Sequence, residues 1–170
     1  MLAHSADKPK KIKRPREEDD PAPLMEPPLM PGFSRSMAGY DQMKAHMLKW
    51  YGKHPQFRYE MEDFDPEHTV TLLDDEGKLM GFFGMWPSVQ DASQRNPLHT
   101  YFTIDVLEVM EEYRGKGLGR RLLDQVVAIG RQGGYNYIRT YAVEEAFEFY
   151  INYGFSANKL VKGTNVCLKL

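Results

Sequence analysis

The sequence predicts a single α/β domain built on a mixed β-sheet. Apolar residues recur at helical spacing over residues 37–51 and again over 118–131. β-rich runs at about 99–110 and 135–142 stand on either side of the second of these helices. A strand, a helix and a strand in succession predict a parallel pair of strands joined across the helix.

The first folded element is expected to be the helix over residues 37–51. Its apolar and aromatic side chains recur every three or four residues, and Ser36 stands where an N-cap is expected. Two β-rich runs follow, at residues 68–73 and 78–85. The Asp-Asp-Glu-Gly segment between them predicts a tight turn and therefore a β-hairpin.

The rest of the chain continues the alternation of helices and strands. We expect a polar loop at 87–97, strand 99–110, helix 118–131, strand 135–142, helix 144–153 and two final strands at 155–161 and 164–170. The sheet is therefore expected to contain both antiparallel hairpins and one parallel pair.

Composition narrows the class of protein. A chain of 170 residues suits one domain, and a formal net charge of −2 argues against binding nucleic acid through bulk charge. The single cysteine, Cys167, excludes an internal disulfide framework and favours a reducing compartment. No apolar run reaches the ~18–20 residues that a membrane span requires, and the start of the chain shows no secretory signal. We therefore expect a soluble, cytoplasmic protein.

The N-terminal residues differ from the rest. Residues 1–36 hold seven of the eleven prolines and are expected to form a disordered or extended arm, so that the folded domain spans 37–170. A basic block at residues 8–16 is followed by acidic residues 17–20. We interpret the arm as a solvated tail. A nuclear-import signal and a docking arm for a protein partner are the alternatives.

A glycine-rich basic loop, Arg114-Gly-Lys-Gly-Leu-Gly119, precedes the 118–131 helix. The N–H groups at a helix N-terminus favour an anion, and glycines let the anion come close to the backbone. The alternative is a glycine-rich turn with a solvated basic edge. Two nucleotide motifs fail on spacing. Lys116 is not followed by the Ser or Thr of a Walker loop, and the third glycine of a dinucleotide fingerprint is missing.

The loop resembles the acetyl-CoA signature of the GNAT superfamily of N-acetyltransferases, Arg/Gln-x-x-Gly-x-Gly/Ala, at Arg114, Gly117 and Gly119. A second block, Ala146 to Phe155, is similar to that family's Ala-x-x-x-Tyr-x-x-x-Gly-Phe element. The two blocks are separated by a helix and a strand, as in the family. The resemblance implies an acyl-CoA N-acyltransferase fold, whose mostly antiparallel sheet has fourth and fifth strands that run parallel and splay apart.

The same resemblance implies acetyl-CoA as cosubstrate and no metal. The pantetheine arm would lie along the fourth strand, at Leu107, Val109 and Met110. Arg114 and the backbone N–H groups of the following loop would hold the pyrophosphate, namely those of Gly115, Lys116, Gly117, Leu118, Gly119 and Arg120. One position departs from the family pattern. Many members carry Asn three residues before the alanine of the second block, and this chain has Val143, which puts one cofactor contact in doubt.

Acetyl transfer to an amine requires a group that takes the amine proton and a group that protonates the leaving thiolate. The resemblance implies that Tyr150 is the general acid, and packing within its helix is the alternative. Strand alternation places Asp105 on the same side as Thr103, Leu107 and Val109. Asp105 stands where related enzymes that act on polyamines and arylalkylamines carry Glu or His, so it is the candidate base. It is otherwise a binding site for a cationic substrate, or a surface carboxylate.

Other residues are weaker candidates for the base or for the acceptor site. Glu108 and Glu111 are less well placed as bases, and the remaining residues that could border the acceptor site are His99, Tyr101, Trp86, Phe82 and Phe83. The five histidines show no metal-ligand spacing, so no metal site is predicted.

The sequence therefore predicts an N-acetyltransferase that moves an acetyl group from acetyl-CoA to a primary amine of a small molecule or a protein. A homodimer is a further expectation. The alternative from another class is a GNAT-fold binding or structural module that docks to a partner assembly through the N-terminal arm. A toxin that acetylates aminoacyl-tRNA is a third reading, to which the near-neutral charge gives little support.

Overall fold

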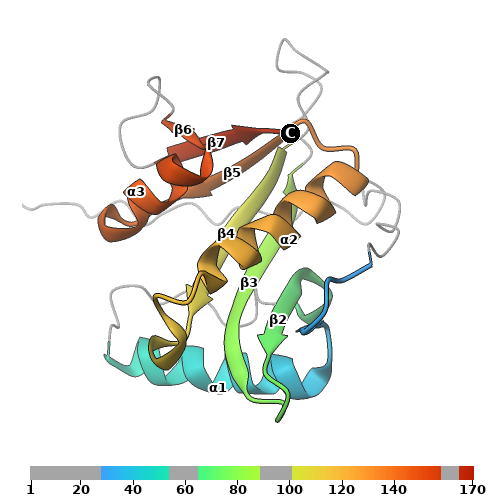
Figure 1. Cartoon of the computed structure of the whole chain (residues 1–170), viewed down its shortest axis with the longest axis vertical. Coiled ribbons are helices and arrows are strands. Elements are labelled where there is room, and N and C mark those ends of the chain that lie inside the picture. Colours follow the sequence, from blue (N-terminus) through green and yellow to red (C-terminus); the bar gives the residue numbers. More distant parts are fainter. Residues whose placement is uncertain (1–27, 54–64, 89–100, 158–164) are drawn as a thin grey trace, which may run out of the picture.

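The computed structural model describes residues 28–53, 65–88, 101–157 and 165–170. These residues form a seven-stranded sheet in the order β1-β2-β3-β4-β5-β7-β6 (Figure 1). The strands are β1 (Phe33–Ser34), β2 (Thr69–Leu73), β3 (Leu79–Ser88), β4 (Tyr101–Val109), β5 (Tyr137–Tyr141), β6 (Ser156–Ala157) and β7 (Asn165–Lys169). The helices are α1 (Met37–Lys53), α2 (Leu118–Gln132) and α3 (Glu144–Tyr153), with short 3-10 turns η4 (Pro66–His68) and η5 (Glu111–Tyr113).

The sheet is mixed, as predicted. β4 and β5 pair in parallel across α2, and every other neighbouring pair in the described sheet is antiparallel. The predicted helices and strands form within the described residues, and the expected hairpin joins β2 to β3. Several expectations fall partly outside those residues. The loop predicted at 87–97 is described only at Pro87 and Ser88, which belong to β3. Residues 99–100 of the strand predicted at 99–110 and residues 158–164 of the two final strands are not described.

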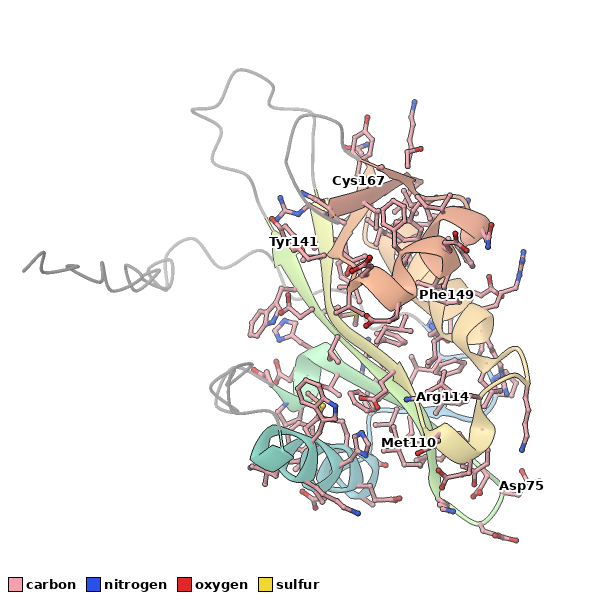
Figure 2. The ribbon with its side chains drawn as sticks, turned by 90° about the vertical axis from the view of Figure 1, so that its left-hand side faces the viewer. Asp75, Met110, Arg114, Tyr141, Phe149 and Cys167 are labelled. Carbon is pink, nitrogen blue, oxygen red and sulfur yellow. The ribbon has the colours of Figure 1, made fainter. Side chains whose placement is uncertain are left out.

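Helices lie on both faces of the sheet. α2 and α3 cover one face and α1 lies on the other (Figure 2). The apolar stripe predicted for the first helix is buried, since Met43 and Met47 are 0% and 4% exposed. Ser36 caps this helix as predicted, because its Oγ accepts a hydrogen bond of 3.2 Å from the Gly39 N–H. No described helix has the length and apolar character needed to cross a membrane.

The predicted boundary at residue 36 is wrong, because residues 28–36 already belong to the fold. Phe33 pairs with Leu72 at the edge of the sheet and is buried. Farther back, the Met30 N–H donates a 2.7 Å hydrogen bond to the side-chain oxygen of Gln125, on α2. These contacts join segments far apart in the chain, so local composition could not reveal them. Residues 1–27 of the predicted arm lie outside the described residues.

A β-bulge interrupts β4 near its middle. Gly84 pairs with Val106, but the next residue of β3, Met85, pairs with Ile104. Asp105 is therefore an extra residue on β4 with no counterpart on β3. A bulge bends its strand and increases the local twist.

The bulge reverses the side-chain alternation of β4. Ile104 and Leu107 pack in the same core, on the α2 and α3 side, although they are three residues apart. Val106 packs in the other core, under α1. The expectation that Thr103, Asp105, Leu107 and Val109 share one side is therefore wrong. A regular strand has a period of two, and the extra residue shifts that period by one.

The parallel pairing of β4 and β5 is short. It joins residues 101–104 to residues 137–140 and stops there, although β4 continues to Val109. Beyond the last pair, Ile104 with Thr140, the two strands diverge (Figure 1). The second half of β4 therefore presents its backbone edge to the space between the two strands, as the predicted splay requires.

Candidate active site

The loop before α2 turns on two glycines with left-handed backbone conformations. Gly115 has φ = 75° and Gly117 has φ = 76°, a region that other residues enter only with strain. A Cβ on either glycine would meet no atom within 4 Å. The loop therefore leaves open space at both positions, where the sequence predicts a bound anion.

The N-terminus of α2 offers backbone donors at the same place. The first hydrogen bond that ties the helix to its cap runs from the Arg121 N–H to the Gly117 carbonyl, at 3.2 Å. The N–H groups of residues 118–120 precede it and have no partner within the helix. Because these groups also carry the positive end of the helix dipole, they favour an anion. The geometry fits the pyrophosphate group predicted from the sequence.

Gly119 has a different role from the other two glycines of the loop. A Cβ there would lie 3.1 Å from the Phe149 ring and 3.9 Å from the Val109 side chain. Gly119 is therefore the point at which α2 and α3 approach each other. Its N–H still belongs to the first turn of α2, so its predicted contact through the backbone remains available.

The basic side chains around the loop divide into two groups. Lys116 and Arg120 are exposed. The Lys116 ammonium lies 5.1 Å from the centroid of the Tyr113 ring, and the Arg120 guanidinium lies 5.6 Å from the centroid of the Tyr153 ring. Both can reach an anion at the helix N-terminus. Arg121 instead points toward the N-terminal segment, where it donates a hydrogen bond to the Pro31 carbonyl. It does not add its charge to the loop.

Arg114 joins the loop to the end of β4. Its Nε donates a 3.1 Å hydrogen bond to the Val109 carbonyl, and its Nη2 lies 3.8 Å from Glu108 Oε1. The same carboxylate oxygen lies 3.1 Å from His46 Nε2, on α1. Glu108 therefore faces the α1 side and is engaged in ion pairing, which agrees with its place as a weaker candidate base.

The free edge of β4 carries the backbone groups of Leu107 and Val109. The Met110 N–H donates to the Met80 carbonyl at 2.9 Å, and Val109 is paired with Gly81. In an antiparallel ladder this pattern makes Gly81 and Val109 a non-hydrogen-bonded pair, so the N–H and C=O of Val109 point away from β3. The same holds for Leu107, two residues earlier. Both therefore face the space between β4 and β5, as predicted.

Met110 was predicted to contact the cofactor, and its geometry does not support that role. Its N–H is bonded to Met80, and its carbonyl accepts a 2.9 Å hydrogen bond from the Tyr113 N–H. Its side chain is 7% exposed and packs in the core beneath α1. The residue ends the strand and fixes the following turn.

Tyr150 lies in the interior beside the point of divergence. It is 5% exposed, and its ring makes edge contacts with Phe149 and Phe155, each at 5.2 Å between centroids. Burial is the larger influence on the pKa of Tyr150, and the side chain of Thr140 acts in the opposite direction. Burial raises the pKa of Tyr150 to about 12. Tyr150 therefore keeps its proton at neutral pH, as a general acid must.

Thr140 joins β5 to β4 through its side chain. Its Oγ1 donates a buried 3.0 Å hydrogen bond to the Ile104 carbonyl, at the last pair of the parallel ladder. Asp105 directly follows Ile104, at the bulge, and is exposed. The fold thus brings the predicted acid and the predicted base to the same end of the β4–β5 pair, from positions 45 residues apart in the chain.

A row of polar and aromatic residues crosses the opposite face of the sheet. Trp86 pairs with Thr103, Thr103 with Arg139 and Arg139 with Cys167, so the four lie side by side across β3, β4, β5 and β7. This is the side away from α2 and α3, on which Tyr141 also lies (Figure 2). The Thr103 Oγ1 is buried and has no hydrogen-bond partner among the described residues.

The remaining candidates for the acceptor site differ in burial and in whether the structure describes them. Trp86 is half-buried and stacks on His68 with 4.7 Å between ring centroids. Phe82 and Phe83 are both fully buried in the two cores, so packing is their role. Glu111 is exposed in η5. His99 lies outside the described residues, as does the side chain of Tyr101.

Sequence reasoning did not identify several residues near the site. Thr140 could have been noticed, because it is a polar residue two positions after the buried Ile138 and therefore on the inward side of the strand. No sequence pattern indicates the stacking of His68 on Trp86 or the contact of Phe149 with Gly119, because each contact joins distant segments. Within the described residues, no group of His, Cys, Asp and Glu is arranged to hold a metal ion.

The departure at Val143 also has a structural consequence. Val143 is the N-cap of α3, and its side chain makes no capping hydrogen bond. It is 61% exposed. An Asn at this position could cap the helix and reach a ligand, whereas Val offers neither contact.

Comparison with solved structures supports the fold. An acetyltransferase of the GNAT family from Listeria monocytogenes has a TM-score of 0.61 at 13% identity, covering 81% of this chain and 94% of that one. N-acetylglutamate synthase from Neisseria gonorrhoeae, complexed with coenzyme A and N-acetylglutamate, has a TM-score of 0.61 at 15% identity over 81% of this chain and 34% of that one. A GNAT acetyltransferase from Brucella melitensis in complex with acetyl-CoA has a TM-score of 0.53 at 14% identity, over 81% and 86% of the two chains.

Sequence comparison supports the family. Mycothiol acetyltransferase from Propionibacterium freudenreichii subsp. shermanii is 35% identical over 96 residues, which are 55% of this chain and 29% of that enzyme. The chain therefore matches less than a third of the length of this relative. The model of the acetyltransferase (GNAT) family matches residues 38–155, well over half of the 170 residues. The chain belongs to the GNAT acetyltransferase family.

Proposed function

We propose that the protein transfers an acetyl group from acetyl-CoA to a primary amine. The observation that carries this proposal is the position of Tyr150, a buried, protonated phenol at the point where β4 and β5 diverge. An anion site at the start of α2 and a free edge of β4 lead to this point. Together they form a path suited to a long ligand with a phosphate group at one end and a thioester at the other.

The residues present fit acetyl-CoA. The N–H groups of residues 118–120, with Lys116 and Arg120 beside them, would hold the pyrophosphate. The backbone of Leu107 and Val109 would pair with the pantetheine amides, as an added strand pairs with a sheet edge. Arg114 occupies the Val109 carbonyl, so the Val109 N–H and the Leu107 groups are the donors and acceptors that this edge offers. When bound, acetyl-CoA supplies an acetyl thioester.

Two residues of the chain would then accept and donate the protons of the reaction. A primary amine must be neutral to attack, and Asp105 is proposed to accept its proton, directly or through water. Tyr150 would hold its proton at Oη for the leaving thiolate. Burial disfavours the phenolate form of Tyr150, so the acid is protonated when each cycle begins.

The amine acceptor is proposed to approach from the α1 side of the sheet, since α2 and α3 cover the other face. The row from Trp86 to Arg139 lies on this side and includes Thr103, whose hydroxyl has no partner among the described residues. Both a small amine and the amine of a protein side chain or N-terminus suit such a face. A cytoplasmic location, a homodimer and a docking role for the N-terminal arm remain predictions.

A direct assay tests the function. The full chain is incubated with acetyl-CoA and a panel of amines and peptides, and free thiol is measured. Acceptor-dependent thiol release, with acetylated product seen by mass spectrometry, is the expected result. Deletion of residues 1–27 should leave this activity intact and remove any partner binding that depends on the arm. If neither form releases thiol with any acceptor, and acetyl-CoA does not raise the melting temperature, the proposal fails. Binding of acetyl-CoA without turnover in both forms would instead favour a binding or structural module.

A further inference from the structure

We propose that Asp74, at the tip of the β2–β3 hairpin, is a positioning residue that acts through Tyr113. It would hold the anion loop, Arg114 to Gly119, in the conformation that binds the pyrophosphate. The inference rests on the acetyl-CoA binding of the proposed function and not on the transfer of the acetyl group. Neither Asp74 nor Tyr113 belongs to the two blocks that carry the family resemblance.

The two carboxylate oxygens of Asp74 have different partners. Oδ1 accepts hydrogen bonds from the N–H groups of Glu76, at 3.0 Å, and Lys78, at 2.8 Å, which fixes the hairpin turn. Oδ2 accepts a 2.9 Å hydrogen bond from the Tyr113 hydroxyl, 39 residues farther along the chain. The Lys78 N–H and the Tyr113 hydroxyl lower the pKa of Asp74 by donating to its carboxylate. The acceptor is therefore ionised at neutral pH, and a hydrogen bond to a charged group is stronger than one between neutral groups.

Tyr113 connects this carboxylate to the anion loop. It is the last residue of η5, directly before Arg114, and its N–H donates to the Met110 carbonyl at 2.9 Å. Its ring packs against the core beneath α1. The Lys116 ammonium lies 5.1 Å from the ring centroid, within the range of a cation–π contact. The hydrogen bond to Asp74 thus fixes the orientation of a ring that contacts one cation of the anion site.

An ion pair makes a second connection between the hairpin and η5. Lys78 Nζ lies 3.0 Å from Glu112 Oε1, but both side chains are more than half exposed, and an exposed ion pair contributes little to stability. The Lys78 ammonium also lies 5.6 Å from the centroid of the Tyr113 ring. The hydrogen bond between Asp74 and Tyr113 is therefore the stronger of these two connections.

The anion loop requires such support because of its glycines. Gly115 and Gly117 have left-handed backbone conformations, and a Cβ on either would meet no atom within 4 Å. Glycine loses more conformational freedom than other residues when it is ordered. If the connection to the hairpin is lost, a smaller fraction of molecules has the loop in its binding conformation. The apparent dissociation constant then rises in inverse proportion to that fraction.

The test measures affinity by calorimetry for two ligands, acetyl-CoA and the phospho-ADP half of coenzyme A, which contains the pyrophosphate and lacks the pantetheine arm. Tyr113→Phe removes the hydroxyl and keeps the ring that contacts Lys116. It should weaken the binding of both ligands by the same factor, about 2- to 5-fold. Asp74→Ala should weaken both at least as much, and adding Tyr113→Phe to Asp74→Ala should cause no further loss. In the acetylation assay, KM of Tyr113→Phe for acetyl-CoA should rise while kcat at saturation stays the same.

The matched control is Tyr153→Phe, which also removes a hydroxyl that donates to a carboxylate. Tyr153 Oη donates to Asp124 Oδ1 at 2.7 Å, so this bond joins α3 to α2 and not the hairpin to the anion loop. The substitution keeps the ring beside Arg120. Tyr153→Phe should leave the dissociation constants of both ligands unchanged.

Each contrary result identifies what has failed. Unchanged affinities in Tyr113→Phe, additive losses from Tyr113→Phe and Asp74→Ala, or an equal loss in Tyr153→Phe would overturn the inference. A loss confined to acetyl-CoA, with the phospho-ADP half bound as tightly as by the wild type, would also overturn it, because the change would then lie outside the anion loop. A wild type that binds acetyl-CoA but acetylates no acceptor would overturn the proposed function and leave this role in place. A wild type that binds neither ligand would overturn both.

Discussion

Gly119 on α2 lies against the ring of Phe149 on α3, with 3.1 Å between the ring and the position that a Cβ on Gly119 would take. The two glycines of the loop signature therefore meet different physical requirements. Gly117 is glycine because of its backbone conformation, with φ = 76° and open space around it. Gly119 is glycine because a neighbouring helix is packed against it. A pattern of residue types does not distinguish these two causes.

The contact between Gly119 and Phe149 predicts an energetic coupling. Gly119→Ala should cost about 1 kcal/mol more in the wild type than in Phe149→Leu, because the smaller side chain leaves room for the added methyl group. Urea unfolding of the two single variants and the double variant measures this difference. Gly115→Ala is the control, since its Cβ would meet no atom, and its cost should be the same in both backgrounds. Additive effects of Gly119→Ala and Phe149→Leu would contradict the proposed contact.

The charge at the start of α2 predicts a salt-dependent affinity for the cofactor. Lys116→Gln should weaken acetyl-CoA binding by about 2- to 5-fold at low ionic strength, and by less as salt screens the interaction. Arg131→Gln is the matched control, because it removes one exposed cation from the last turn of the same helix. It should leave the dissociation constant unchanged. Calorimetry at two salt concentrations makes the comparison, and equal effects of the two variants would exclude a local phosphate site.

The burial of Tyr150 and its proposed role as the acid predict a defect in turnover rather than in binding. Tyr150→Phe should lower kcat by about 10- to 100-fold, because a thiolate must then leave without a proton from the protein. The dissociation constant of acetyl-CoA should change by less than about 2-fold, since Phe keeps the ring packing. Steady-state kinetics and calorimetry test this pair of results. Loss of cofactor binding together with turnover would show that Tyr150 is mainly a packing residue.

Asp105, exposed at the bulge, could accept the amine proton or only bind a cationic acceptor, and kinetics of an Asp105 variant distinguish these two roles. If Asp105 accepts the amine proton, Asp105→Asn should lower kcat by about 10-fold or more. If it only binds a cationic acceptor, KM for the amine should rise while kcat at saturation stays the same. We expect the first result. Glu111, an exposed acid in η5 just after the end of β4, is the control, and Glu111→Gln should have neither effect.

The pKa of Tyr150 predicts a loss of stability in alkali. Burial raises this pKa to about 12 in the folded protein, whereas an unfolded tyrosine ionises near pH ~10. The folded state thus holds the proton more tightly, so its contribution is complete below about pH 10 and is lost as the pH rises through about 12. Between pH ~8 and ~11, the wild type should lose about 1 kcal/mol more unfolding free energy than Tyr150→Phe. Chemical unfolding at each pH measures this, and parallel curves would contradict it.

Much of the fold could be predicted because its signals are local. The periodicities of α1, α2 and α3 depend on residues within one element, and so do the hairpin turn and the Ser36 cap. The parallel pairing of β4 and β5 followed from the order of elements, because a strand that returns across a helix must run in the same direction. The anion loop and Tyr150 lie within short contiguous segments whose residue types are specific.

The tertiary structure decided everything that depends on a partner strand or a distant segment. The bulge at Asp105 arises from the register between β3 and β4, so no inspection of β4 by itself reveals which side its residues face. The Arg121 side chain donates a hydrogen bond to the Pro31 carbonyl, and the Met110 N–H donates one to the Met80 carbonyl. These partners are close to each other only after folding. The sequence by itself determined the family and singled out Tyr150 as the proposed acid. Long-range pairing decided which predicted residues reach the site, because hydrogen bonds and packing are satisfied in space rather than along the chain.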